Sequence, residues 1–462
     1  MTFRCIHGCG ILEGNRDLPL TLNWAPLESH AYDFLGLSKL NPLATKARMQ
    51  ILTEALAAGD RWISYSRFKQ FYTHGQRYYR DTYTYAGILP AVDQLAAAGM
   101  IEHEKMRPGH RGFQSRFRAS PALLAETTKV EIIYEPMEII IVRDVNGLPI
   151  DYRDNRQTRA MRRRLQGLNE GLVAQQIGLG GRIIREGDRL DNGGRAQVQL
   201  NRIFHRGDFD LGGRLYGGHW QNIGDRHLLD INGQPTVEVD YVAMHVGLLY
   251  QEIGKPMPAG DPYDLDGWSR DHAKLAVFIG INAKNRIHAV LALADRLRLD
   301  GGFCYPFEAA KALLQAVKDK HPDIAHAFHS DAGVRLMRRD SDLAEKIMRQ
   351  MVRTTGIVPL PVHDSFIVPS ALEGKLRETM ESASPCRTES KIPCRTDPQN
   401  GDNFLPVNPT SSPKNDLQYG TDTVALPLDG WVVVGGPVVG WLHYGVRTGD
   451  VVEWFGSPGW LT

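Results

Sequence analysis

The spacing of apolar residues predicts a helical region near the start of the chain. Leu43, Ala47 and Ile51 recur at helical spacing, and similar patterns predict helices over 66–72 and 86–98. Between these segments the sequence is polar and rich in tyrosine. We therefore expect three short helices that share one apolar core.

A basic hairpin follows the third of these helices. A strand starts at Met100–Ile101, Pro108–Gly109 forms a turn, and the returning strand carries arginines. Three helices followed by a basic hairpin is the order of elements in a winged helix. Tyrosines interleave with arginines before the third helix, a mixture that suits contacts to phosphate and sugar. We expect a nucleic-acid-binding domain with contacts from Arg77, Arg80, Arg111 and Arg116; the alternative is a packing or dimerisation domain with a solvated basic face.

A further helix is predicted over 153–175, and it is strongly basic. Arg156, Arg159 and Arg163 fall on one stripe of this helix. Such a stripe can hold backbone phosphates beside a polymer-binding cleft, or it can be a solvated helix face. The pattern alone leaves both alternatives open.

Two aspartates stand at the ends of strand-like runs. The sequence TVEVDYVAMHVGLLY reads as a strand that delivers Asp240 and continues into a helix. The sequence GIVPLPVHDSFIVP reads as a hairpin with Asp364 in its turn. Two carboxylates brought together between apolar strands repel each other unless a divalent cation neutralises them. Two Mg²⁺ ions about 3.5–4 Å apart are the usual means of moving a nucleotidyl group in line.

Cationic and polar groups that suit nucleotides flank these aspartates in the sequence. Arg270, Lys274 and Phe278 fall at i, i+4 and i+8 of a predicted helix, so they share one face. An anionic ligand such as a triphosphate would offset the repulsion between the two cations. Upstream, the glycine-rich run LGGRLYGGHWQNI carries Arg214 and the pair Gln221–Asn222, which suit a nucleic-acid backbone or minor groove.

The order of these four motifs resembles the palm-and-fingers core of family A DNA polymerases and of their relatives, the single-subunit phage-type RNA polymerases. The resemblance covers about residues 200–370. It implies that Asp240, Asp364 and the Tyr241 carbonyl bind two Mg²⁺ ions. It also implies roles for residues that handle the substrates: Arg270 and Lys274 on the phosphates, with Lys274 as proton donor to pyrophosphate, Phe278 by the sugar and base, His363 at the primer terminus, and Arg214, Gln221 and Asn222 along the duplex.

The sequence departs from the family pattern in ways that bear on the choice of sugar. DNA polymerases of this family usually have Glu after His-Asp, whereas this chain has Ser365, as the RNA-synthesising relatives do. Asn282 stands where the family usually has Tyr. His245 occupies the position five after Asp240 where DNA polymerases use Glu to exclude ribose, and it can either block a 2′-hydroxyl or bond to one. No carboxylate set for a proofreading exonuclease is evident in the first 200 residues.

Composition and charge fit a globular protein that meets an anionic partner. The chain has 462 residues and a net charge of +1, but the segment from Arg61 to Arg118 carries an excess of six positive charges. No apolar run approaches the roughly 18 residues that span a bilayer, and no secretory signal is evident. Five cysteines form no disulfide framework, which favours the cytoplasm.

Together these patterns predict an α+β protein with a right-hand polymerase-like palm and fingers helices, preceded by a winged-helix-like domain. The expected function is DNA-directed DNA synthesis on a template–primer from nucleoside triphosphates. Alternatives are a single-subunit RNA polymerase or primase, and a non-catalytic DNA-binding replication initiator; the oligomeric state is left open. The expected segments are an N-terminal segment 1–40, the winged-helix-like domain 41–125, a basic connecting or thumb-like region 126–199, palm and fingers 200–382, and a Pro/Gly-rich linker with a Trp-rich tail 383–462.

Overall fold

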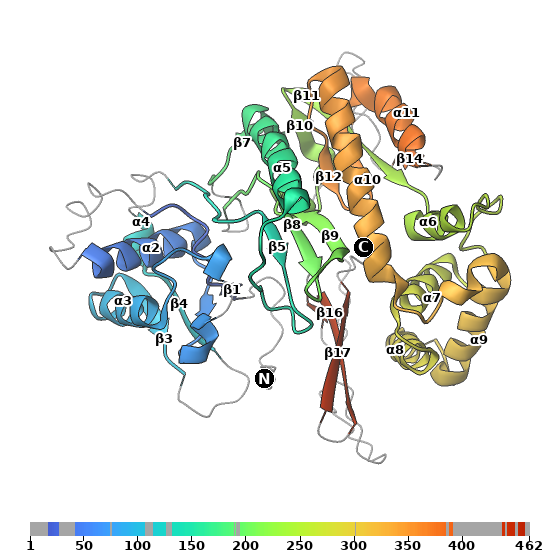
Figure 1. Ribbon diagram of the computed structural model, residues 1–462, viewed down its shortest axis with the longest axis horizontal. Coiled ribbons are helices and arrows are strands. Elements are labelled where there is room, and N and C mark those ends of the chain that lie inside the picture. The colour runs from blue at the N-terminus through green and yellow to red at the C-terminus, as the bar shows by residue number, and fades with distance from the viewer. Residues whose placement is uncertain are drawn as a thin grey trace, which may run out of the picture. The chain divides into compact units, whose positions relative to one another are not determined.

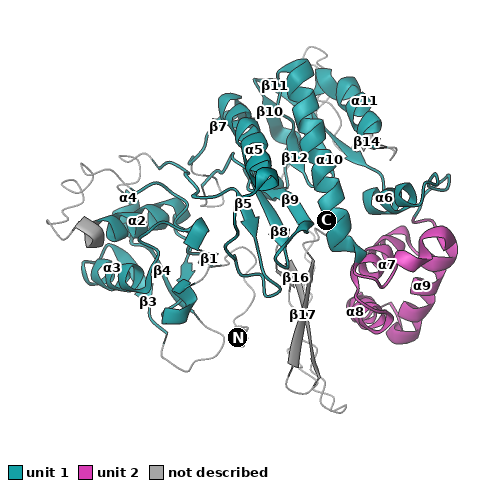
Figure 2. Ribbon diagram, viewed as in Figure 1, with its two compact units in different colours: residues 1–262, 332–393 teal, residues 263–331, 394–462 magenta. Residues whose placement is uncertain are grey.

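The computed structural model describes most of the chain and divides it into two compact units (Figure 2). The first unit comprises residues 1–262 and 332–393, and the second comprises residues 263–331 and 394–462. Both helices and strands are present, so the predicted α+β class is confirmed. Among the described helices, none is both long and apolar enough to cross a bilayer. The described residues are 17–26, 42–73, 76–106, 114–125, 132–188, 190, 195–300, 302–384, and the strand segments 388–390, 437–438, 441–448 and 451–457.

The front region of the first unit combines two main helices with a small sheet. The strand order is β1-β2-β4-β3, in which β1 runs parallel to β2 and the other pairs are antiparallel. The first and third predicted helices and both strands of the predicted hairpin are confirmed. The elements are β1 (Leu18–Pro19), α2 (Pro42–Ala58), β2 (Ile63–Tyr65), α3 (Tyr85–Ala97), β3 (Ile101–Glu104), β4 (Ser115–Ala119) and α4 (Pro121–Ala125).

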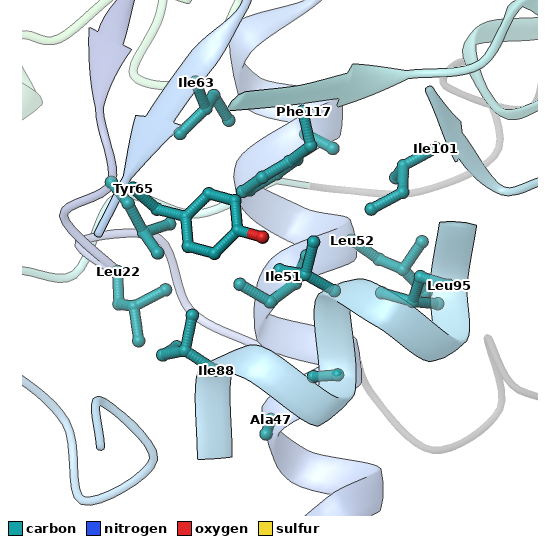
Figure 3. Close-up of a cluster of buried hydrophobic side chains, with 14 of the residues drawn as sticks. Leu22, Ala47, Ile51, Leu52, Ile63, Tyr65, Ile88, Leu95, Ile101 and Phe117 are labelled. Atoms are coloured by element: carbon teal, nitrogen blue, oxygen red, sulfur yellow. The ribbon is translucent and has the colours of Figure 1, made fainter. Parts of the chain in front are cut away.

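This front region has its own apolar core (Figure 3). Ile51 and Leu52 of α2 pack with Ile88 and Leu95 of α3 and with Phe117 of β4, and all five side chains are buried. Burial of each such side chain stabilises the fold by about 1.5–3 kcal/mol. The apolar residues at helical spacing and those that alternate along the strands are therefore buried in the same core.

The second predicted helix, over 66–72, is wrong. In its place residues 66–68 follow strand β2 without regular structure, and the rest of the range lies in the short 3₁₀ helix η1 (Lys69–Thr73), which is followed by η2 (Gln76–Tyr78). The hydroxyl of Ser66 accepts a hydrogen bond from the backbone N–H of Phe68, and Tyr72 donates to the Ser66 carbonyl at 2.5 Å. These local bonds compete with a regular helix, because they occupy the groups that a helix would pair.

The largest sheet of the first unit carries both predicted aspartate motifs. The strand order along it is β12-β13-β11-β10-β6-β7, and β14 (Thr388–Ser390) also pairs with β11. Because β6 and β7 come from residues 177–184, the predicted connecting or thumb-like region 126–199 contributes strands to this sheet. The strands are β6 (Ile177–Leu179), β7 (Arg182–Ile184), β10 (Leu229–Ile231), β11 (Gln234–Tyr241), β12 (Leu360–Val362) and β13 (Ser365–Pro369).

A second sheet, in the order β5-β8-β9, packs against the long helix α10. Arg202 of β8 is buried and ties the two together, since its guanidinium donates to Glu345 at 2.9 Å and to Ser341 at 2.8 Å, both on α10. Figure 1 shows α5 running beside α10. The predicted basic helix over 153–175 is confirmed as α5. The elements are β5 (Ile140–Val142), α5 (Arg156–Ala174), β8 (Asn201–His205), β9 (Asp208–Tyr216), α6 (Met244–Glu252), α10 (Ala332–Thr355) and α11 (Glu373–Ala383).

The second unit is built mainly from three helices inserted in the sequence between α6 and α10. The predicted segment 200–382 therefore supplies residues to both units. The side chain of Ser269 caps the first of these helices by accepting from the backbone N–H of His272. In the tail the described residues form three short strands in one sheet, in the order β15-β16-β17. The elements are α7 (Arg270–Asn282), α8 (Arg286–Leu299), α9 (Pro306–Lys320), β15 (Pro437–Val438), β16 (Trp441–Thr448) and β17 (Val451–Ser457).

Candidate active site

Strand pairing brings the two predicted aspartates side by side. β11 and β13 are antiparallel, and Asp240 stands opposite Ser365. The backbone N–H of Tyr241 donates to the carbonyl of Asp364 at 3.4 Å. Asp240 is buried, with 7% of its surface exposed, whereas Asp364 is half-buried. Two residues that lie 124 positions apart in the sequence therefore meet at one end of the central strand.

The turn that carries Asp364 is tight and strained. Val362 pairs with Ser365, so the hairpin loop contains only His363 and Asp364. His363 has a φ of +60°, a conformation that two-residue hairpin turns normally assign to glycine and that costs a bulky residue about 1–3 kcal/mol. Its ring lies edge-on to Tyr216, with 5.8 Å between the centroids. Such strain is typical of functional loops. Because the loop has only two residues, the pairing of its flanking strands sets the position of the His-Asp pair at the end of the sheet.

A third acidic side chain, Glu238, accompanies Asp240 on β11. Residues two apart on a strand share a face, so the two carboxyl groups lie on the same side of the sheet. Glu238 is buried, and it accepts hydrogen bonds from the Ser365 hydroxyl at 2.6 Å and from Arg226 at 2.9 Å. The sequence analysis missed this residue, although the alternation Glu-Val-Asp in a strand places it beside Asp240.

Arg214 lies in a buried ionic cluster with Asp340 and His245. Its Nη2 lies 2.5 Å from Asp340 Oδ2, and His245 Nε2 lies 3.1 Å from the same oxygen. Burial alone would raise the pKa of Asp340, but the Arg214 charge and the His245 contact outweigh it and hold that pKa below its ordinary value. β9, α6 and α10 each supply one member, so the cluster joins three elements.

The negative charge of Asp364 also acts on Arg214 of this cluster. Burial lowers the pKa of Arg214, but the negative charges around it, Asp340 first and Asp364 among the others, raise it above its ordinary value. A glycine positions the arginine, because Gly213 has a φ of +85° and an added Cβ would lie 2.8 Å from the Phe204 ring. Asp340 was missed by the sequence analysis. The guanidinium of Arg214 already forms an ion pair with Asp340. Its predicted contact with a duplex stays a prediction.

Gln221, which was predicted to contact the duplex, is buried and hydrogen-bonded within the protein. Gln221 lies in η4 (His219–Asn222) and is 5% exposed. Its side-chain amide donates to the carbonyls of Leu215 and Pro361, and its oxygen accepts from Gly217. These bonds tie β9 to β12, so Gln221 positions the hairpin that carries Asp364. Its neighbour Asn222 is exposed, and the prediction for it remains.

The predicted triphosphate-binding residues share one face of α7 in the second unit. Arg270 and Lys274 are exposed and Phe278 is half-buried, whereas Ala273 and Ala276 on the opposite face are buried. The predicted helix and its shared face are thus confirmed. Their roles beside Asp240 stay predictions, because Asp240 belongs to the first unit and α7 to the second.

The arginines predicted to bind nucleic acid from the front region have acidic neighbours. Arg77 forms ion pairs with Glu138 at 2.8 Å and Asp154 at 2.7 Å, and Arg80 pairs with Glu135 at 2.7 Å. These bonds fasten the front region to residues 135–154. Arg116 pairs with Glu104 at 2.8 Å and lies over the ring of Trp62. Arg111 lies outside the described residues.

The donor atoms near Asp240 suit magnesium. Mg²⁺ prefers hard oxygen ligands and is usually bound by one or two carboxylates together with substrate phosphates. Asp240, Asp364 and the Tyr241 carbonyl supply oxygens of this kind. In the part of the chain that the structure describes, no group of three or more His, Cys, Asp or Glu side chains is arranged to hold a metal ion.

Comparison with known proteins adds no relative. No protein-family model matches the chain, and no curated protein matches it. The functional argument therefore depends on the residues and contacts described above.

Proposed function

We propose that this protein is a template-dependent nucleotidyltransferase that extends DNA primers with deoxynucleoside triphosphates in the cytoplasm. The observation that carries the proposal is the pairing of β11 with β13, which sets Asp240, opposite Ser365, beside the hairpin turn that carries Asp364. The order of the four sequence motifs points to the same chemistry. In the proposed reaction a 3′-hydroxyl attacks the α-phosphate, and pyrophosphate leaves.

The residues of the chain have distinct parts in this reaction. Asp240, Asp364 and the Tyr241 carbonyl would hold two Mg²⁺ ions, which would supply neutralisation of phosphate charge and a lower pKa of the attacking hydroxyl. Arg270 and Lys274 bind the triphosphate, and Lys274 protonates the leaving pyrophosphate. Phe278 packs against the sugar or base, and His363 contacts the primer terminus.

The front region is proposed to bind nucleic acid as a winged-helix-like domain. Support comes from its element order of helix, strand, 3₁₀ turns, helix and hairpin, and from the sheet order β2-β4-β3. Arg116 is one-third exposed on the hairpin strand β4, while Arg77 and Arg80 are more covered by their acidic partners. Arg116 is therefore the strongest candidate among these residues for a contact with phosphate.

RNA synthesis or priming is the second candidate, and two contacts favour it. Ser365, which stands after His-Asp as in the RNA-synthesising relatives, donates its hydroxyl to Glu238 of the neighbouring strand. Nε2 of His245 lies within 3.3 Å of both Arg214 and Asp340. These two contacts hold the imidazole ring of His245, for which the resemblance implies control of the 2′-hydroxyl. The held imidazole offers a polar edge to the sugar instead of a Glu carboxylate.

Primer extension with Mg²⁺, with dNTPs and NTPs offered separately, tests the proposal. We expect extension with dNTPs, loss of extension in both Asp240→Asn and Asp364→Asn, and unchanged binding of the primer–template. Asp319→Asn, at an exposed position of α9, is the matched control and should extend normally. Extension that survives either active-site change would remove the two-metal assignment.

The remaining outcomes separate the alternatives. Extension with NTPs alone would favour the RNA polymerase or primase. Absence of extension with either substrate, combined with salt-sensitive DNA binding, would favour the non-catalytic replication initiator.

A further inference from the structure

Four arginines line a groove between α5 and α10. The groove has a volume of about 400 Å³, with Arg163, Arg164 and Gly167 of α5 on one side and Arg349 and Arg353 of α10 on the other. Arg163 and Arg353 are exposed, and the other two arginines are about one-third exposed. On each helix the lining residues are spaced by three or four positions, so one face of α5 and one face of α10 line the groove.

The positive charge in this groove is only partly compensated. Glu345 pairs with Arg164 and lies 3.8 Å from Arg349, but it also pairs with the buried Arg202. One carboxylate thus serves three guanidinium groups. Like charges held this close destabilise the fold unless an anion joins them.

A glycine leaves the groove open. Gly167 stands in the interior of α5, where glycine is about 1 kcal/mol less favourable than alanine. A Cβ built on Gly167 would meet no atom within 4 Å, whereas one on Gly171 would come within 2.6 Å of Val358. Packing therefore explains Gly171 but not Gly167. The missing side chain at Gly167 keeps space free beside the guanidinium groups.

The shape and the length of the basic surface suit a single nucleic-acid strand. Packed helices have axes about 8–10 Å apart, so a groove between them admits one chain of phosphates and not a duplex. The exposed Arg156 and Arg159 extend the basic stripe along α5, and Arg156 stands about 10 Å before Arg163 along the helix axis. A lone phosphate needs a single guanidinium fork, while a row of forks matches a phosphodiester chain.

We propose that the groove between α5 and α10 binds the phosphate backbone of a single-stranded nucleic acid. This inference goes beyond the proposed polymerase activity, because none of the groove residues belongs to the site around Asp240 and Asp364. It also decides between the two alternatives that the basic stripe leaves open in the sequence.

The test is fluorescence anisotropy of the full chain with a labelled 12-nucleotide oligothymidine, in EDTA and over a range of salt concentrations. Log K decreases as log salt increases, and in the double variant Arg349→Gln/Arg353→Gln this negative slope should become shallower by about 1.4. Each lost phosphate contact removes about 0.7 from its magnitude. The affinity at low salt should drop at least tenfold. Lys375→Gln on α11 changes an exposed cation elsewhere, and it should leave both values unchanged.

A second variant keeps folding separate from binding. Gly167→Glu places a carboxylate in the groove and raises helix propensity, so it should remain folded while it loses affinity for the oligonucleotide. Affinity and salt slope equal to the wild type in both variants would overturn the inference. So would a loss of affinity for a blunt duplex as large as the loss for the oligonucleotide in both variants, or complete competition by millimolar inorganic phosphate, which would make the groove a simple anion site. Asp364→Asn should bind the oligonucleotide normally, so failure of the catalytic proposal would not affect this result.

Discussion

The ion pair between Arg214 and Asp340 allows a sharp test of how the site is held together. In Asp340→Asn the volume is kept, but an amide replaces a carboxylate that receives Arg214 at 2.5 Å and 3.0 Å. The Asp340 side chain is 1% exposed and that of Arg214 is 12% exposed. Removal of one partner of such a buried pair costs about 3–5 kcal/mol, because the remaining charge stays buried without compensation. We expect a loss of stability of that size.

Urea unfolding followed by tryptophan fluorescence measures this loss, since Trp220 is buried in the same unit. The double variant Arg214→Met/Asp340→Leu should be less destabilised than the sum of its two single variants, because no charge is left unpaired. The exposed pair Lys311–Glu308 provides the control, and Glu308→Gln should have little effect.

The pH dependence gives the same test an independent readout. The pKa of Asp340 is lowered in the folded protein, so its stabilisation is complete above the ordinary value of 3.8 and is lost as the pH falls through the folded pKa. The difference between wild type and Asp340→Asn should therefore shrink in acid. A variant that unfolds at the same urea concentration as the control, or a difference that persists unchanged in acid, would refute the reasoning.

Three further outcomes follow from other buried groups. Burial raises the pKa of Glu54 to about 7, so this group contributes about 3 kcal/mol of stability that is lost between pH 4.5 and 7, and Glu54→Gln should reduce the pH dependence of urea unfolding between pH 4 and 8 by that amount. Burial raises the pKa of Glu186 to about 7 as well, so the share of the pH dependence that belongs to Glu186 should remain in this variant. Gly213→Ala should lower the melting temperature, because its φ is positive and its Cβ would crowd Phe204; Gly233→Ala, which has a similar φ but open space, should cost less in the same melting experiment. Ser365→Ala should cost about 1–3 kcal/mol in urea, since it removes a buried donor from Glu238, whereas Ser370→Ala at an exposed bond should cost less.

The elements around the site could be predicted where the pattern is local. The strand and helix around Asp240, the hairpin at Asp364 and the shared face of Arg270 and Lys274 all follow from periodicity within about fifteen residues. Strand pairing then places Asp240 beside the turn that carries Asp364.

Partners from distant segments could not be read from the sequence. Asp340 lies in the charged run RRDSD, which looks like a solvated helix face, and its partner Arg214 is 126 residues away. Gln221 looked like a ligand-binding amide, but the backbone groups that satisfy it come from β9 and β12. Ser66 was assigned to a helix because its local hydrogen bonds leave no trace in apolar spacing.

The small strand β14 has a consequence for any attempt to shorten the protein. Val239, Asp240 and Tyr241 pair with Ser390, Glu389 and Thr388 on one side of β11, while Asp240 pairs with Ser365 on the other. The backbone of Asp240 is therefore paired with a strand on each side, β13 and β14. A chain cut after residue 384 keeps every residue of the proposed chemistry, yet it turns the strand that carries Asp240 into an open edge at that point.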